Sequence, residues 1–115
     1  MQKNTFGKAG EIIACNYLKQ KGYKIIGTNV KNLIGEIDII AKDNKTLIFV
    51  EVKTRASNAF GSPLEAIDQR KQHKIRQVAT MWQKQHKQLE APSRFDAISI
   101  VGFEEPEITH IIDAF

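Results

Sequence analysis

The stretch Leu47-Ile48-Phe49-Val50-Glu51-Val52-Lys53-Thr54 decides the fold, because it reads as the central strand of a β-sheet. It is apolar on both faces and rich in β-branched residues, as strands buried on both sides are. Only Glu51 and Lys53 interrupt the apolar pattern. Side chains alternate across a strand, so these two charges share one face.

The preceding stretch, Ile34-Gly35-Glu36-Ile37-Asp38-Ile39-Ile40, carries two acidic residues in the same alternating fashion. A turn at Asp43-Asn44-Lys45 joins it to the central strand, which predicts an antiparallel hairpin. If Asn44-Lys45 is the two-residue turn, Asp38 lies opposite Glu51 and Glu36 lies opposite Lys53. The Cβ atoms of such opposed pairs are roughly 5 Å apart.

Two carboxylates that face each other between apolar strands repel, so either one is protonated or a cation lies between them. Oxygen ligands without nearby His or Cys favour Mg²⁺ or Mn²⁺ over zinc. Lys53, on the same face, could orient or help to deprotonate an attacking water and stabilise charge on a phosphate. The alternative is a Glu36–Lys53 ion pair on a solvated sheet face.

Further helices and strands surround this hairpin. A helix is expected over 5–21, ended by Lys21-Gly22, and a long helix from Ser62 as N-cap to about Gln88. The expected strands cover 23–30, 34–41, 46–54 and 94–101, with a fifth at 108–112. This α/β order predicts one sheet with helices packed against it, in a single domain over residues 1–115.

Composition excludes several classes of protein. The chain has 115 residues, is 42% hydrophobic and carries a net charge of +4. No apolar run approaches the roughly 20 residues that a membrane-spanning helix needs. The N-terminus lacks the apolar core of a secretory signal, so a cytoplasmic location is expected. The single cysteine, Cys15, forbids an internal disulfide and is expected to be a packing residue.

The long helix carries a basic run, Arg70-Lys71-Gln72-His73-Lys74-Ile75-Arg76. Three of its residues are expected to point outward and to contact phosphates, unless they form only a solvated face; these are Arg70, Lys74 and Arg76. Lys71 instead interrupts an apolar stripe. Its ammonium must either extend to solvent or meet a carboxylate or phosphate at the sheet.

The remaining candidates give weaker signals. His73, His86 and His110 lack the spacing of metal ligands, and each is expected at the surface. Trp82 is expected in the core. Asp96 is expected only to cap the sheet edge, and the loop 55–61 either grips a nucleic-acid strand or is a plain connection.

Asp38 followed by Glu51-Val52-Lys53 resembles the PD-(D/E)XK nuclease signature, with Ile37 in place of the proline. A larger set of motifs resembles the YraN family of bacterial proteins, predicted endonucleases similar to archaeal Holliday junction resolvases. This resemblance extends over nearly the whole chain. Its motifs are Gly10-Glu11, Gly35-Glu36-Ile37-Asp38-Ile39-Ile40, Phe49-Val50-Glu51-Val52-Lys53-Thr54-Arg55, Phe60-Gly61, Lys71 and Arg94-Phe95-Asp96.

The resemblance implies a restriction-endonuclease-like α-β-β-β-α-β core, whose mixed sheet contains a three-stranded antiparallel meander. It also implies a metal site made from Asp38, Glu51 and the backbone carbonyl of Val52, with Lys53 as the catalytic lysine. Glu11 matches a helix-borne acid that resolvases add to this site. Glu36 is expected at the site as the residue that positions Lys53 rather than as a metal ligand. Arg55 and Lys71 are expected to bind nucleic acid.

The expected function is therefore Mg²⁺-dependent or Mn²⁺-dependent hydrolysis of DNA, on branched or otherwise structured substrates. The main alternative is a nucleic-acid-binding module of nuclease ancestry without catalytic activity. A third option is a protein-interaction domain whose hairpin charges form a solvated ladder. The sequence leaves a homodimer open, because resolvase-like enzymes pair to cut two strands.

Overall fold

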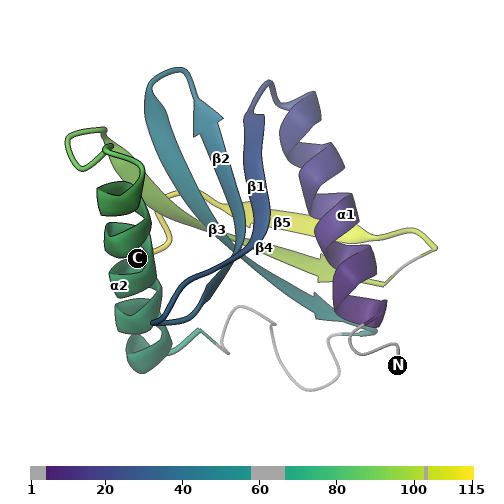
Figure 1. The fold of residues 1–115 in the computed structure, drawn as a ribbon. Coiled ribbons are helices and arrows are strands. Elements are labelled where there is room, and N and C mark those ends of the chain that lie inside the picture. Colours follow the sequence, from purple (N-terminus) through teal and green to yellow (C-terminus); the bar gives the residue numbers. More distant parts are fainter. Residues whose placement is uncertain (1–4, 58–66, 103) are drawn as a thin grey trace.

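A computed structural model of the chain describes residues 5–57, 67–102 and 104–115. Two helices and five strands are present in these residues (Figure 1). In chain order they are α1 (Thr5–Gln20), β1 (Lys24–Lys31), β2 (Glu36–Asp43), β3 (Thr46–Arg55), α2 (Gln69–Gln85), β4 (Ser93–Val101) and β5 (Glu107–Ile111).

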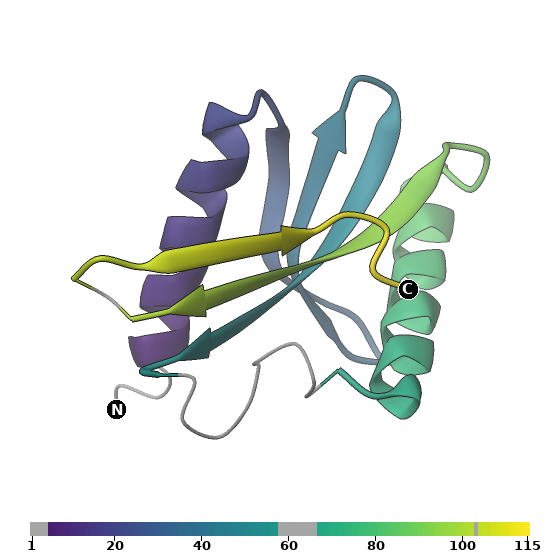
Figure 2. The ribbon, with the colours of Figure 1, turned by 180° about the vertical axis from the view of Figure 1, so that it is seen from behind.

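The five strands form one mixed sheet in the order β1-β2-β3-β4-β5. The first three strands make an antiparallel meander, β3 and β4 are parallel, and β5 returns antiparallel to β4. The parallel pair requires a crossover, and α2 lies within it. Figures 1 and 2 show α1 and α2 on opposite faces of the sheet. The expected mixed α/β architecture is confirmed.

Each helix covers its own apolar cluster. On the α1 face, Ala14 and Leu18 pack on residues from β2, β3 and β4, whereas on the α2 face Ile75, Val78 and Trp82 pack on β2, β3 and Phe95. Successive side chains of β3 point alternately into the two clusters, so this strand is buried on both faces. Trp82 lies in the core, as expected.

The hairpin between β2 and β3 has the predicted register. Ile39 pairs with Val50 and Asp43 with Thr46, which leaves Asn44-Lys45 as the turn. Asn44 has a φ of 55°, a left-handed conformation that asparagine tolerates better than most residues do. Counting onward from Ile39 and Val50, Asp38 and Glu51 are the next residues of their strands.

The second helix is shorter than predicted. Its N-cap is Asp68, whose carboxylate accepts a hydrogen bond from the backbone N–H of Lys71, and it ends at Gln85 rather than near Gln88. The predicted start at Ser62 lies outside the described residues, but Ile67 and Asp68 are not helical. The capping carboxylate therefore sets the helix start. No helix in the described ranges is long and apolar enough to span a membrane.

Candidate functional site

The candidate site lies where β2 and β3 part. Beyond the Ile39–Val50 pair, the backbone N–H of Val52 donates a hydrogen bond of 2.8 Å to the Asp38 carboxylate instead of to a partner strand. The first turns of both helices lie toward this end of the sheet (Figure 1). The Asp38 side chain thus takes the place of a backbone hydrogen bond between the two strands, and this bond holds Asp38 beside β3.

Asp38 and Glu51 form a buried acidic pair. Burial, and next the negative charge of Glu51, raise the pKa of Asp38 to about 7, against the opposing effect of the hydrogen bond from Val52. The side chain of Glu51 is only 7% exposed. At neutral pH this pair therefore needs a shared proton or a nearby cation, as the sequence predicts.

Two lysines meet the Glu51 carboxylate. Lys71 Nζ on α2 lies 2.9 Å from Glu51 Oε2, and Lys53 Nζ on β3 lies 3.4 Å from the same oxygen. Of the two alternatives that the sequence leaves for Lys71, the structure shows contact with a carboxylate at the sheet. The helix and the central strand are thereby joined through the site.

These lysines differ in their proton affinity. Burial lowers the pKa of Lys53, and the adjacent ammonium of Lys71 lowers it again, against the attraction of Glu51. Burial also opposes the charge of Lys71, but its hydrogen bonds with Lys53 and Glu51 outweigh burial and raise its pKa. Lys53 is therefore the lysine of the pair that releases its proton more readily. A lowered pKa is typical of catalytic lysines.

A cavity of about 330 Å³ opens on the α1 side of Asp38. Glu11 and Glu36 line it together with Asp38, so the structure brings the predicted acids to one place. Glu11 is held there by a hydrogen bond of 2.9 Å from the side-chain amide of Asn29. Sequence reasoning did not single out Asn29. In the structure its φ of 50° marks a special backbone position.

Glu36 does not have the predicted partner. In the described part of the chain, the ion pair of Lys53 is with Glu51, and Glu36 is exposed at the end of β2, where it pairs with Lys31 of β1. The predicted Glu36–Lys53 contact assumes that the hairpin ladder continues. It stops because Asp38 takes the N–H of Val52.

The donor atoms at this site fit a hard divalent cation. Two adjacent carboxylates offer oxygen ligands, and a cation between them would relieve the repulsion that raises the pKa of Asp38. Among the residues that the structure describes, no three His, Cys, Asp or Glu side chains are grouped closely enough to hold a metal ion by themselves. A complete coordination shell would therefore need backbone oxygens, water or substrate.

The basic residues of α2 do not form one face. Arg70 and Lys74 are exposed on the side of the helix that carries Lys71, whereas the Arg76 guanidinium lies over the Phe95 ring, 4.7 Å from its centroid. Residues two apart on a helix point about 200° apart, which separates Arg76 from Lys74. All three side chains are exposed, as predicted, but Arg76 points to the other side of the helix. Arg55 is exposed at the end of β3.

A second buried charge cluster lies on the α1 face of the sheet, against Tyr17. Asp96 is completely buried and accepts hydrogen bonds from Arg94 at 2.9 Å and from His110 at 2.7 Å. His110 also contacts the Tyr17 hydroxyl, and its side chain is only 6% exposed. The predictions of a surface histidine and of an edge-capping aspartate are therefore wrong, whereas His73 and His86 are exposed as predicted.

The same signal that revealed Glu51 and Lys53 could have revealed this cluster. Arg94 and Asp96 alternate in a strand that carries no other charge, so they share one face. Burial alone would raise the pKa of Asp96, but the hydrogen bonds from His110, Arg94 and Asp113 hold it below its usual value. Cys15 is half-buried against the α1-face cluster, as a packing residue would be.

Comparison with known proteins shows the family of the chain. The model described as "Uncharacterised protein family UPF0102" matches residues 10–100. A UPF0102 protein of Geotalea daltonii is 47% identical over 113 residues, covering 96% of this chain and 89% of the relative. A second, from Caldanaerobacter subterraneus, is 43% identical over 121 residues, covering 100% and 98%. The chain belongs to the UPF0102 family, which is the YraN family that its motifs indicate.

Proposed function

We propose that this chain is a Mg²⁺-dependent or Mn²⁺-dependent nuclease that hydrolyses phosphodiester bonds in structured DNA, built on a restriction-endonuclease-like core. The observation that carries the proposal is the meeting of Asp38, Glu51 and Lys53 at one end of the sheet, with a raised pKa on Asp38 and a lowered pKa on Lys53. Shifts in opposite directions within one small region are typical of sites that move protons.

Three groups of this chain would hold the metal ion, namely the carboxylates of Asp38 and Glu51 and the backbone carbonyl of Val52. A bound divalent cation supplies Lewis-acid polarisation of a phosphate oxygen. Asp38 must be ionised to bind the metal ion fully. Its pKa is about 7, and a bound cation favours the charged carboxylate, so the metal ion would shift Asp38 to its ionised form at neutral pH.

The lysines supply the rest of the proposed chemistry. Lys53 lies next to Glu51, and its lowered pKa suits it to orient the attacking water and to accept or share its proton. In its charged form it stabilises the negative charge that develops on the phosphate. Lys71 contacts the Glu51 carboxylate and fixes its position from α2.

Substrate binding is assigned to the cations around the site. Arg70 and Lys74 extend from the exposed side of α2, and Arg55 lies at the end of β3. Contacts of such residues with phosphates set affinity without reading base sequence. The net charge of +4 is compatible with a polyanionic substrate.

One observation favours the alternative of a binding module without catalytic activity. Glu51 Oε2 already has two ammonium partners, at 2.9 and 3.4 Å, so this carboxylate is neutralised without a metal ion. If that arrangement persists when DNA is bound, the basic surface would bind phosphates and no hydrolysis would follow.

A nuclease panel separates the two functions. Purified protein is incubated with four-way junction, flap, single-stranded and duplex DNA of matched sequence, in Mg²⁺, in Mn²⁺ and in EDTA. The proposal predicts metal-dependent cleavage that Asp38→Asn abolishes. Binding without cleavage by any metal-loaded sample would favour the binding module, and neither binding nor cleavage would reject both.

A further inference from the structure

The turn between β1 and β2 presents an apolar side chain to solvent. Leu33 is 97% exposed, more than any other large hydrophobic residue in the described parts of the chain. A single exposed leucine is ordinary on a protein surface. Leu33 is unusual for three reasons, namely the ordered conformation of its turn, the basic residues around the turn and the position of the turn relative to the candidate site.

Hydrogen bonds hold the turn in one conformation. The side-chain oxygen of Asn32 accepts from the backbone N–H groups of Ile34 and Gly35, at 3.0 and 3.4 Å. Its amide donates to the carbonyl of Val78 on α2 at 3.1 Å. Ile34 packs toward the α2-face cluster, so the turn is fastened to the helix while Leu33 projects outward.

Gly35 allows this close approach. A Cβ atom at this position would lie 3.2 Å from the Val78 side chain and 3.4 Å from Lys74 Cε. Because the turn is already ordered, burying Leu33 in a partner would cost little conformational entropy of the backbone. The structure thus presents a preformed apolar tip rather than a loose loop.

The position of the turn relates it to the candidate site. Asn32 contacts Val78, which follows Lys71 by seven positions on α2, and Lys71 contacts Glu51. Seven residues of helix correspond to a rise of about 10 Å. The turn is therefore separated from the site by a length comparable to a few base steps of DNA, at roughly 3.4 Å each.

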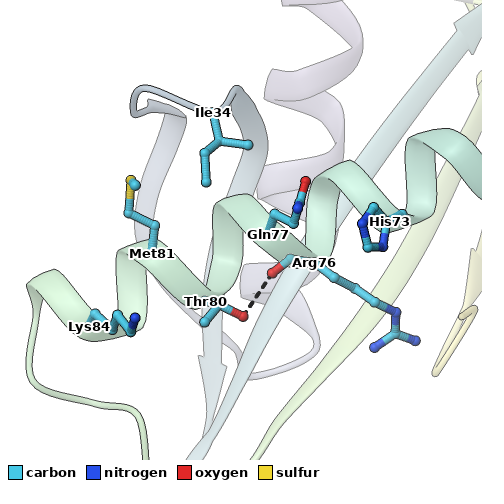
Figure 3. Close-up of a pocket in the computed structure, with 7 residues that line it drawn as sticks. All are labelled: Ile34, His73, Arg76, Gln77, Thr80, Met81 and Lys84. Atoms are coloured by element: carbon cyan, nitrogen blue, oxygen red, sulfur yellow. Dashed lines mark hydrogen bonds between the residues drawn. The ribbon is translucent and has the colours of Figure 1, made fainter.

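Basic residues outnumber acidic ones around the turn. Lys31 precedes the turn and Lys74 lies beside Gly35, whereas Glu36 follows the turn and pairs with Lys31 across the two strands. On the other side, Ile34 lines a shallow pocket of about 420 Å³ on α2 that has basic but no acidic lining residues (Figure 3). The basic members of that lining are His73, Arg76 and Lys84. DNA is a polyanion whose stacked bases present apolar faces. An apolar tip flanked by basic residues is therefore complementary to DNA.

We propose that Leu33 is a wedge that enters the base stack of DNA a few base steps from the phosphate that the metal ion at Asp38 and Glu51 would hold. This inference rests on the proposed nuclease function and specifies its substrate class. The favoured substrate is DNA that is kinked or unstacked near the cleavage position, such as a junction or flap. Apolar side chains inserted between base steps unstack them and bend the duplex, at a cost that is smallest where stacking is already broken.

Fluorescence of 2-aminopurine in an immobile four-way junction tests the wedge in the full-length protein. The probe base is placed at successive positions along each arm, and Ca²⁺ replaces Mg²⁺ to suppress cleavage. Wild type should raise the fluorescence several-fold at one position near the branch. Leu33→Ser should abolish this rise and leave the melting temperature unchanged, because the side chain is exposed. Leu89→Ser, which alters another exposed leucine in the connection after α2, should behave as wild type.

A cleavage assay in Mg²⁺ completes the test. Leu33→Ser should slow cleavage of the fully paired junction by about 10-fold or more, and unpaired bases at the probe position should restore the rate. If wild type cuts DNA and Leu33→Ser unstacks and cuts equally well, the wedge is rejected while the nuclease function stands. An equal loss in Leu89→Ser also rejects it. If wild type neither binds nor cuts any DNA, the nuclease function itself fails.

Discussion

Lys71 Nζ lies 2.9 Å from Glu51 Oε2, and this contact joins α2 to the central strand at the candidate site. The helix reaches its position through the β3–β4 crossover, so the crossover places a cation beside a strand carboxylate. Displacing that cation with a metal ion, or adding the metal beside it, would change the charge balance of Asp38 and Glu51.

The stability of the metal-free protein should fall as the pH rises from about 4 to about 7. The pKa of Asp38 is about 7 in the folded chain against an ordinary value of 3.8, so the folded chain keeps a proton that the unfolded chain releases in this window. The free energy of unfolding should decrease across it by up to about 4 kcal/mol relative to a chain without this group. Urea unfolding in EDTA measures the effect.

Asp38→Asn provides the comparison for that pH dependence, because asparagine cannot ionise. Its stability should exceed that of wild type increasingly as the pH rises toward 7. Glu90→Gln, which changes an exposed carboxyl after α2, is the matched control. Parallel pH curves for wild type and Asp38→Asn would show that Asp38 titrates as an ordinary carboxylate.

Mg²⁺ or Mn²⁺ should raise the melting temperature of wild type at pH 7. A ligand that binds only the folded chain stabilises it, by about 2.7 kcal/mol at a hundredfold excess over the dissociation constant. Asp38→Asn should lose most of this rise, because it removes a charged oxygen ligand. Differential scanning fluorimetry across a metal titration is the measurement. An equal rise in both proteins would place the metal elsewhere.

Removing two exposed cations of α2 should weaken DNA binding in a salt-dependent way. If Arg70 and Lys74 each contact a phosphate, the double change to Gln should reduce the log–log salt slope by about two. Lys24→Gln should leave the slope unchanged, because Lys24 is exposed at the start of β1, at the other end of the sheet. Fluorescence anisotropy at several salt concentrations gives the slopes. Equal slopes in wild type and the double variant would show that these cations only face solvent.

Asp96→Asn should destabilise the fold without impairing the metal effect. Asp96 is completely buried and bonded to Arg94 and His110, so losing its charge leaves Arg94 imperfectly paired, at a cost of about 3 kcal/mol. The low pKa of Asp96 means that its contribution is present above about pH 4 and is lost as the pH falls through the folded pKa. Urea unfolding at pH 7 should show the cost, and a value below 1 kcal/mol would contradict it.

The sequence predicted the local parts of this arrangement well, for physical reasons. The hairpin register follows from alternation of side chains and from a turn that Asn44 can adopt, and both are properties of neighbouring residues. The apolar stripe of α2 identified Lys71 as misplaced. The identity of its partner depends on how the crossover packs α2 against β3, which no local pattern fixes.

The errors share a nonlocal cause. His110 is buried because Asp96, on the neighbouring strand, supplies a partner at 2.7 Å, and a lone histidine in the sequence carries no sign of this. The Glu36–Lys53 pair failed because one side-chain hydrogen bond, from Val52 to Asp38, ends the ladder. Both outcomes depend on hydrogen bonds between strands rather than on periodicity.

The most direct test of the central claim compares Lys53→Ala with wild type in cleavage and in binding. Lys53 is proposed to act in the transition state, so its loss should lower the cleavage rate about 100-fold or more and leave DNA affinity in Ca²⁺ nearly unchanged. Excess Mn²⁺ should not rescue the variant, and Lys24→Ala, at an exposed lysine of β1, should cut as wild type does. Cleavage by Lys53→Ala at the wild-type rate, or no cleavage of any substrate by wild type in either metal, would contradict the account.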